Sequence, residues 1–427
     1  MSKYFDSSVE FLKDLVKIKS VKAEPLKDMP FGKGINDALL FTLNHAKSLG
    51  FEIKNIDGYA GEIIFGDGKD EDGLAILCHL DVVPEGNASL WTYPPYSATT
   101  VGERIYGRGV LDNKGSTALC LYALKELKEN GFTPSRKIKL IVGLDEESGS
   151  ACMAYYKKVA VMPKEGFSPD GEFPVIYAEK GIYRLTFKVK KHSRILQIQG
   201  GEKINVVCDK AFCQVENLTE KEKQIAKNLG LKTDGDKVYS YGKNAHASTP
   251  DLGENAIDKL VEFLCAIGLQ DKKIHDGLFK DEYKIKELQD HSGKLTMSPD
   301  IISCDDEFIY ISVDVRYPVT FTFEEISNKF SKIGEICSYE HTNPLCVDKN
   351  GKFVQTLLSC YREVTGDYSE PIAIGGGTYA KELALGVAFG PLCSKGSGPH
   401  TIDEFMDVKD LKTNYDIYLK AIKRLCE

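Results

Sequence analysis

Two short apolar runs with a helical segment between them constrain the fold of this chain more than any other feature. Residues 73–80 (GLAILCHL) and 137–144 (KIKLIVGL) have the length and continuous apolar character of buried strands. Between them, residues 116–130 carry apolar side chains at helical spacing and end before Gly131, a residue that suits a helix terminus. This strand–helix–strand order predicts an α/β fold, with a mostly parallel sheet sandwiched by helices.

The middle of the chain predicts a second, inserted domain. Residues 182–190 and 308–318 alternate apolar and polar side chains, as half-exposed antiparallel strands do. The α/β pattern then returns with a helix-like segment at residues 353–365. The domains that we expect are a discontinuous α/β domain of residues 1–181 plus 349–427, and an inserted α+β lid domain of residues 182–348.

Composition and charge exclude several classes of protein. The chain has 427 residues and a formal net charge of −8, which argues against a nucleic-acid partner. It contains no apolar run long enough to cross a membrane, and its first residues lack the apolar core of a signal peptide. We therefore expect a cytoplasmic protein. Its 12 cysteines include no CxxC pair, so we expect reduced thiols.

Histidine and acidic residues follow both predicted strands. HLDVVP places His79 and Asp81 at the end of the first strand, and GLDEESG places Glu146 and Glu147 after the second. The carboxyl ends of parallel strands form one edge of an open sheet, where ligands bind. Within each pair, one residue can bind a metal ion while the other orients the ligand or acts as a general base. Solvated loops are the alternative, but acids at the mouth of a buried sheet are costly unless cations neutralise them.

Three residues in other loops extend this set. Asp112 lies in YGRGVLDNKG, and its two carboxylate oxygens can bridge two metal ions about 3.5–4 Å apart. A helix N-cap is the alternative interpretation of Asp112, because a helix is predicted just after it. Asp170 in SPDGEFP and His400 in GPHTIDE lie in turn-like segments. Without the other motifs, each would be interpreted as an ordinary loop residue.

The inserted domain contributes two further candidates. His246 lies in NAHASTP, and a histidine can donate a hydrogen bond to a developing oxyanion. Arg316 lies in VDVRYP, and an arginine can bind a carboxylate through two parallel hydrogen bonds. A turn histidine and an arginine on the surface of a strand are the alternatives.

Taken in order, these motifs resemble those of the co-catalytic zinc peptidases that include ArgE, DapE, aminoacylase and carboxypeptidase G. The SPDGEFP and AEKG elements are most similar to the PepV-type dipeptidases of bacteria. The resemblance runs from the first predicted helix to the last and is weakest at about residues 190–300. It implies a zinc-exopeptidase-like fold and an aminopeptidase-like dipeptidase, in which a water activated between two divalent metal ions hydrolyses dipeptides.

The resemblance also implies a set of metal ligands. His79 and Asp170 would bind the first metal ion, and Glu147 and His400 the second. Asp112 would bridge the two ions. Zinc is the favoured metal, and manganese and cobalt share the same ligands.

Four other residues receive roles from the same resemblance. Asp81 would orient His79, and Glu146 would be the general base that deprotonates the attacking water. In the lid, His246 would polarise the scissile carbonyl and Arg316 would hold the C-terminal carboxylate of a small peptide substrate. An N-acyl-amino-acid deacylase and a tripeptide-cleaving aminopeptidase on the same site are the alternative functions. A non-catalytic binding protein is a further alternative, against which the complete ligand set argues.

Two departures from the family pattern remain. Asn113 follows the predicted bridging residue, where many relatives have a second aspartate and where the peptide bond is often cis. The lid is shorter than in PepV-type enzymes, whose extended lid mimics a second subunit. We expect a monomer, with a homodimer as the alternative, and neither a nucleic-acid nor a membrane partner.

Overall fold

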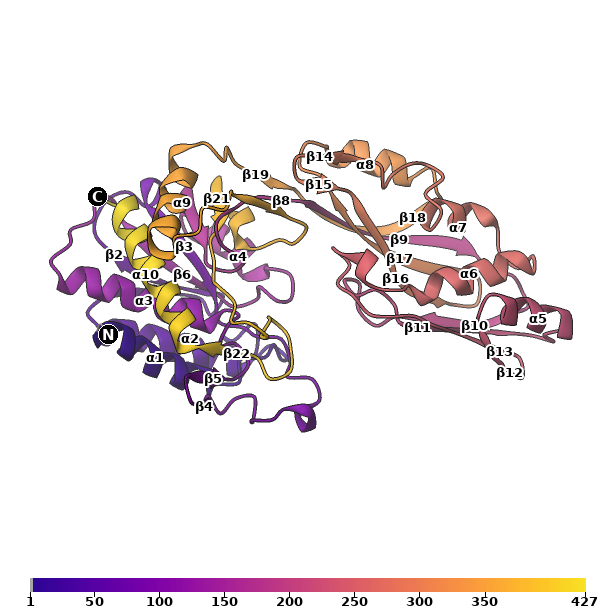
Figure 1. The fold of residues 1–427 in the computed structure, drawn as a ribbon, viewed down its shortest axis with the longest axis horizontal. Helices are drawn as coiled ribbons and strands as arrows, with labels where there is room; N and C mark the ends of the chain where they lie inside the picture. The colour runs from indigo at the N-terminus through magenta and orange to yellow at the C-terminus, as the bar shows by residue number, and fades with distance from the viewer. Residues whose placement is uncertain (1–2) are drawn as a thin grey trace. The chain divides into compact units, whose positions relative to one another are not determined.

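A computed structural model describes residues 3–427, which form two compact units (Figure 1). Of the described residues, unit 1 comprises 3–177, Val347–Ile372 and Thr378–Glu427, whereas unit 2 comprises Ala178–Cys346 and Ala373–Gly377. Each unit has its own β-sheet and its own buried apolar side chains. The predicted roles of the two parts of the chain, as catalytic domain and lid, stay predictions.

The sheet of unit 1 has parallel strands at its centre and antiparallel strands toward its edges. Its strands are, in spatial order, β1 (Glu52–Ile56), β2 (Ala60–Phe65), β6 (Ile138–Gly143), β3 (Leu74–His79), β7 (Glu165–Ser168), β21 (Leu385–Ala388) and the start of β8 (Ile176–Glu179). The strands from β6 to β21 run parallel, while β1, β2 and β8 pair antiparallel with their neighbours. Every residue of β3 and β6 is buried, as strands covered on both faces must be. The predicted α/β class is confirmed, and the antiparallel edges add to it.

Helices cover both faces of this sheet. They are α1 (Lys3–Val16), α2 (Lys33–Ser48), α3 (Lys114–Glu129), α4 (Ala151–Val159), α9 (Lys352–Thr365) and α10 (Val408–Leu425). Gly61 and Gly143 lie on opposite faces, since Gly61 pairs with the residue before Gly143. A Cβ atom at Gly61 would meet Leu39 of α2, whereas one at Gly143 would meet Met153 of α4. The close approach of helices to the sheet explains both glycines.

The three central strands that carry predicted motifs end at the same edge of the sheet. β3 ends at His79, which pairs with Gly143 at the end of the parallel strand β6. β7, on the other side of β3, ends at Ser168, two residues before Asp170. Parallel pairing therefore brings the segments that follow these strands to one edge, as the sequence predicts.

A small sheet next to this edge joins distant parts of unit 1. It consists of β4 (Thr99–Val101), β5 (Arg104–Tyr106) and β22 (Phe405–Asp407). Phe405 pairs with Tyr106, so the segment after His400 lies beside the segment before Asp112. The short helices of this unit are η1 (Asp70–Asp72), η2 (Ala88–Leu90) and η4 (Tyr379–Glu382).

Unit 2 is built on an eight-stranded antiparallel sheet. The order is β12 (Lys232–Asp234), β13 (Lys237–Tyr241), β11 (Lys210–Val215), β10 (Ile195–Gly200), β16 (Thr296–Cys304), β17 (Phe308–Tyr317), β9 (Gly181–Lys190) and β18 (Glu335–Thr342). Burial alternates along β9, as its sequence predicts. The helices are α5 (Glu220–Asn228), η3 (Pro250–Leu252), α6 (Ala256–Ala266), α7 (Lys272–Leu278) and α8 (Phe323–Phe330). Apolar side chains of the α-helices among them pack with those of the sheet into one core.

Short strands complete the molecule. They are β14 (Gln289–Asp290), β15 (Gly293–Lys294), β19 (Leu345–Cys346) and β20 (Ile372–Ile374). Within residues 3–427, no helix is both long enough and apolar enough to cross a membrane. The cysteines of this part of the chain are all free, and the reduced state of their thiols stays a prediction.

Candidate metal centre

Two histidines and three acids predicted from the sequence lie together at the edge of the unit 1 sheet. The Nε2 atom of buried His79 lies 2.9 Å from Oδ1 of Asp112 and 3.5 Å from Oδ2 of Asp170. The Nε2 atom of His400 lies 3.1 Å from Oδ2 of Asp112 and 3.0 Å from Oε2 of Glu147. The two oxygens of Asp112 therefore face two different imidazoles, which is the arrangement that a bridging carboxylate needs.

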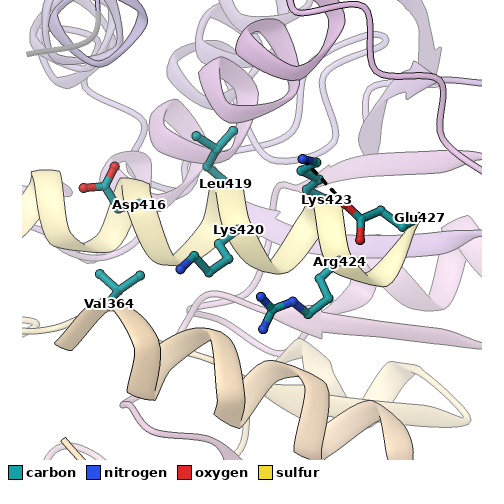
Figure 2. A pocket seen from close by; sticks show the side chains of 7 residues that line it. All are labelled: Val364, Asp416, Leu419, Lys420, Lys423, Arg424 and Glu427. Atoms are coloured by element: carbon teal, nitrogen blue, oxygen red, sulfur yellow. Dashed lines mark ion pairs between the residues drawn. The ribbon is translucent and has the colours of Figure 1, made fainter. Parts of the chain in front are cut away.

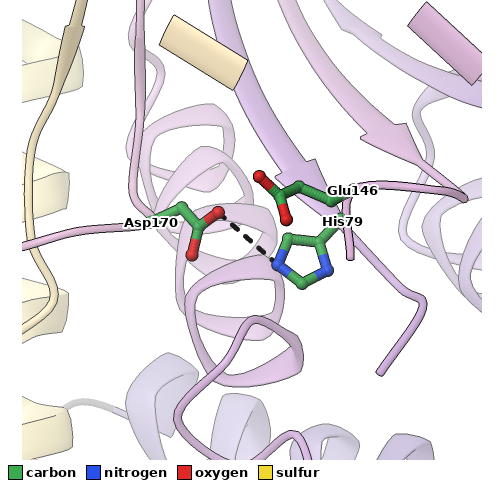
Figure 3. A group of neighbouring side chains, drawn as sticks. All are labelled: His79, Glu146 and Asp170. Carbon is green, nitrogen blue, oxygen red and sulfur yellow. Dashed lines mark ion pairs between the residues drawn. The ribbon is translucent and has the colours of Figure 1, made fainter. Parts of the chain in front are cut away.

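Glu146 completes this cluster from the loop after β6. Its carboxylate and that of Asp170 both lie toward the imidazole of His79 (Figure 3). One ligand atom from each of these three residues lies within 4.8 Å of the others, and the same holds for His79, Asp112 and Glu147. The two groups share His79. This geometry suits Glu146 either as a ligand or as a base beside the ligands.

Asp81 contacts both His79 and the loop that carries Glu146 and Glu147. The Nδ1 atom of His79 lies 2.9 Å from the main-chain oxygen of Asp81 and 3.5 Å from its Oδ1 atom. The carboxylate of Asp81 instead accepts hydrogen bonds from the main-chain N–H groups of Glu146, at 3.1 Å, and Glu147, at 3.0 Å. With Nδ1 occupied, Nε2 of His79 is the nitrogen turned toward the acids. Of the two Asp81 oxygens near Nδ1, the main-chain oxygen is thus the closer.

The helix-cap interpretation of Asp112 does not describe its contacts. Asn113 occupies the N-cap position of α3 and makes no capping hydrogen bond with its side chain. Its Nδ2 atom donates to the main-chain oxygen of Pro169, at 2.7 Å, and to Oδ1 of Asp170, at 3.2 Å. The peptide bond between Asp112 and Asn113 is cis. Asn113 therefore links the Asp112 loop to the loop that carries Asp170.

Burial and mutual repulsion raise the pKa values of three acids of this cluster, whereas the imidazoles of His400 and His79 lower the pKa of Asp112 despite its burial. Burial and the charge of Asp170 raise the pKa of Glu146 well above its usual value. Burial and the charge of Asp112 raise the pKa of Glu147 to about 7. Burial alone would lower the pKa of His79, but the surrounding carboxylates raise it well above its usual value. The common cause is an excess of buried negative charge.

These residues fit divalent cations. Oε1 of Glu147 is buried and has no hydrogen-bond partner among the described residues, so one strong acceptor is left over. Imidazole and carboxylate groups are the ligands that zinc and manganese prefer in hydrolytic sites. Cations would also neutralise the buried acids, whose charges are otherwise costly. The cluster therefore has the donors for two neighbouring ions that share Asp112.

Glu404 is a residue of this region that sequence analysis missed. It lies in the GPHTIDE motif, in which only His400 received a role, and its side chain is fully buried. Its carboxylate accepts a hydrogen bond from Arg108 at 2.7 Å and others from main-chain N–H groups, including that of Asp112 at 3.4 Å. The acid was visible in the motif, but its partners precede it by 292–296 residues. No local pattern could connect them.

His246 and Arg316 lie in unit 2 and are connected there through Gly375. The Nδ1 atom of His246 lies 2.7 Å from Oγ of Ser248. Arg316 is only 3% exposed and donates to both oxygens of Asp314, at 2.5 and 2.9 Å, and to the carbonyl of Gly375 at 3.2 Å. A Cβ atom on Gly375 would lie 3.1 Å from Cβ of Ser248. Arg316 is thus a buried, paired arginine and not the surface arginine of the alternative interpretation.

A separate hollow of about 520 Å³ lies between α9 and α10 of unit 1 (Figure 2). Its charged side chains are paired within the chain. Lys420 and Arg424 contact Glu363, and Lys423 contacts Glu427. No predicted site residue lines this hollow, so it is not a candidate for the catalytic site.

The family model of Peptidase family M20/M25/M40 matches residues 75–424, a range that includes every predicted site residue. The chain belongs to this family. Membership confirms the resemblance inferred from the motifs and the prediction of an enzyme of the metallopeptidase class.

Relatives within the M20/M25/M40 family extend over the whole chain. A protein of Staphylococcus haemolyticus described as "Putative dipeptidase" is 34% identical over 469 residues, which cover 100% of this chain and 98% of that protein. The solved structure of aminoacylhistidine dipeptidase from Vibrio alginolyticus has a TM-score of 0.62 at 14% identity and covers 99% of this chain and 96% of that chain. A tripeptidase from Staphylococcus aureus has a TM-score of 0.60 at 16% identity, with 98% of both chains covered. These structures share the fold of this chain.

Proposed function

We propose that this protein is a metal-dependent dipeptidase that acts on dipeptides with a free C-terminal carboxylate. One observation carries the proposal: the carboxylate of Asp112 lies between the imidazoles of His79 and His400, in a chain of the M20/M25/M40 peptidase family. The relative from Staphylococcus haemolyticus, described as a dipeptidase, supports this substrate class.

Two divalent cations are the proposed cofactors. His79, Asp112 and Asp170 would hold one ion, and Asp112, Glu147 and His400 the other. Zinc is the proposed metal, and manganese or cobalt would use the same ligands. When bound, such ions lower the pKa of a water molecule and polarise the carbonyl oxygen of the scissile bond.

Glu146 is the proposed general base. It lies beside His79 and Asp170, with one ligand atom of each residue within 4.8 Å of the others, so its carboxylate would be next to a water held at the metal centre. An oxygen of Glu146 would take a proton from the attacking water and pass it to the nitrogen of the leaving amine. Asp81 supports this role because it holds the main-chain N–H group of Glu146.

Two residues of unit 2 are proposed to act on the substrate. His246 would donate from Nε2 to the carbonyl oxygen of the scissile bond, because Ser248 occupies its Nδ1 atom. Arg316 would bind the C-terminal carboxylate of the dipeptide. Asp314 holds the guanidinium group through two atoms, so Arg316 would meet the substrate in a fixed orientation. That the protein acts as a cytoplasmic monomer stays a prediction from the sequence.

The proposal is tested by hydrolysis assays on chelated protein to which Zn²⁺ or Mn²⁺ has been restored. The substrates are a panel of dipeptides, the matching tripeptides and N-acetyl amino acids. We expect metal-dependent cleavage of dipeptides and much slower cleavage of the other two classes. Preferential cleavage of tripeptides or acylated amino acids would retain the metal centre and replace the substrate. Absence of turnover with either metal would contradict the proposed enzyme.

A further inference from the structure

Glu404 holds the main chain of the loop that carries Asp112. A single oxygen, Oε1, accepts hydrogen bonds from the N–H groups of Gly109 at 3.0 Å, Leu111 at 2.9 Å and Asp112 at 3.4 Å. The other oxygen, Oε2, pairs with the buried guanidinium group of Arg108 at 2.7 Å. The loop thus wraps around a fully buried carboxylate, and the shape of the loop depends on that carboxylate.

The same residue belongs to the segment that carries His400. Glu404 lies four residues after His400, and its main-chain oxygen accepts a hydrogen bond from Gly107 at 2.9 Å. Asp403, the residue before it, accepts hydrogen bonds from the main chain and the hydroxyl of Thr92, both at 2.7 Å. Glu404 therefore lies where the segments of two neighbouring site residues, His400 and Asp112, are joined.

We infer that Glu404 is a positioning residue of the metal centre, which sets the distance of Asp112 from His79 and His400. This inference rests on the proposed function. A bridging carboxylate must be held to within about 0.5 Å, which requires support from groups that are themselves locked in place. Glu404 supplies that support through the main chain of Asp112. Because Arg108 neutralises Glu404, the support adds no net charge to the acidic cluster.

Glu62 provides a matched comparison in the same unit. It is also a buried glutamate, 1% exposed, and it pairs at 2.9 Å with Lys139, which is 1% exposed. It also contacts Tyr156 and Lys54, and neither of these is a predicted site residue. Loss of Glu404 removes the carboxylate partner of buried Arg108, and loss of Glu62 leaves buried Lys139 with Asp70 as its remaining carboxylate partner, so both changes should destabilise unit 1. A change in metal binding should follow only from loss of Glu404.

The test compares Co²⁺ binding by metal-free wild type, Glu404→Ala, Glu404→Gln and Glu62→Ala, using the visible absorption of bound Co²⁺. Fluorescence of Trp91, the sole tryptophan of the chain, verifies folding, since its ring lies 5.2 Å from the guanidinium group of Arg108. For Glu404→Ala we expect at least about tenfold weaker binding and an altered absorption spectrum. Glu404→Gln retains one acceptor oxygen and should recover part of the affinity. Glu62→Ala should lower the unfolding midpoint and bind Co²⁺ like the wild type.

Dipeptide kinetics provide a second readout on the same proteins. Glu404→Ala should lower kcat much more than it changes KM, because substrate contacts are not altered. If Glu404→Ala does not fold, reduced Co²⁺ affinity of Glu404→Gln supports the inference, and wild-type affinity overturns it. Wild-type affinity and spectrum in a folded Glu404→Ala protein would show a structural role alone and overturn it as well. A wild type that binds no Co²⁺ would overturn the proposed function and, with it, this inference.

Discussion

The side chains proposed to act in the two units are in opposite electrostatic situations. In unit 1, partly buried carboxylates outnumber the imidazoles that face them; the residues are Asp112, Glu146, Glu147 and Asp170 against His79 and His400. In unit 2, the two oxygens of Asp314 pair with Arg316, and the carbonyl of Gly375 takes a further hydrogen bond. The charge of unit 1 is left for a cation to neutralise, whereas the charge of unit 2 is paired within the protein.

Because of this difference, a metal ion and a substrate should affect the protein in different ways. A cation at the unit 1 cluster relieves repulsion between buried acids, so it should stabilise the unit that binds it. A substrate carboxylate at Arg316 must share a guanidinium group that Asp314 already neutralises. The contact with Arg316 should therefore contribute to the affinity for substrate. Substrate binding should leave the stability of unit 2 nearly unchanged.

The largest expected effect concerns the two adjacent acids of the unit 1 cluster. Glu146→Gln should lower kcat about 10³-fold while the protein keeps its full metal content, because only the base is removed. Glu147→Gln should lose metal. Oε2 of Glu147 contacts His400, and its Oε1, which has no hydrogen-bond partner among the described residues, is available to a metal ion. Metal analysis after gel filtration, together with dipeptide assays, distinguishes the two variants. Loss of metal from Glu146→Gln would make Glu146 a ligand.

A smaller effect is expected from the paired arginine of unit 2. Arg316→Lys keeps the charge but loses the two-point contact, and should raise KM for dipeptides about 10- to 100-fold with little change in kcat. Arg184 is the control, since it also contacts Asp314, at 3.2 Å, but is more exposed. Arg184→Lys should have nearly wild-type KM. Dipeptide amides should not distinguish Arg316→Lys from the wild type; an equal rise in KM for amides would show that Arg316 does not bind the carboxylate.

Metal binding should stabilise unit 1 and leave the stability of unit 2 nearly unchanged. At a free metal concentration of one hundred times Kd, binding stabilises the native state by about 2.7 kcal/mol. Hydrogen exchange should slow in the unit 1 segments that hold the cluster, residues 79–82, 108–113 and 145–148. Exchange in β16 and β17 of unit 2 should change little, because neither strand carries a proposed metal ligand. Equal protection of both units by Zn²⁺ would contradict the comparison.

The smallest effect concerns Asp300, a buried acid of unit 2. Burial and the charge of Asp314 raise its pKa to about 8, despite a hydrogen bond from Ser298 and the nearby Arg316. The folded state holds this proton more tightly than the unfolded state. The contribution of Asp300 to the free energy of unfolding is therefore lost as the pH rises. The loss extends from the pKa of Asp300 in the unfolded chain, near 4, to its pKa in the folded protein, about 8.

Asp300→Asn removes this titration. Relative to the wild type, the variant should become progressively more stable between pH 5 and pH 8. Hydrogen exchange of β16 in increasing denaturant, measured at each pH, reports the free energy of unfolding of this region. A constant difference between the two proteins across this range would show that Asp300 is ionised in the folded state.

Sequence alone could predict the parts of the site that follow buried strands. The apolar runs that end at His79 and precede Glu146 define two strands, and a parallel sheet brings strand ends together. The nearness of Asp112 and His400 followed only from the family resemblance, because no local pattern links the loops that carry them. The antiparallel edge strands β1 and β2 have no distinguishing motif, and sequence analysis did not predict them.

Contacts between side chains and distant main chain were beyond sequence analysis. The carboxylate of Asp81 binds the N–H groups of Glu146 and Glu147, and that of Glu404 binds the Asp112 loop. Such contacts depend on the tertiary approach of loops, which neither spacing nor composition encodes. The pairing of Arg316 with Asp314 is different, since residues two apart on a strand share a face. The spacing of these two residues could have predicted the contact, but the contact was not predicted.

The most direct test of this account is the number of metal ions that one chain binds. Native mass spectrometry of metal-free protein titrated with Zn²⁺ measures it, and Asp112→Asn serves as the comparison because Asp112 faces both histidines. The account predicts two Zn²⁺ ions per wild-type chain and weakened binding of both ions in Asp112→Asn. A wild-type chain that binds one ion or none, or an Asp112→Asn chain that binds two as tightly as the wild type, would contradict it.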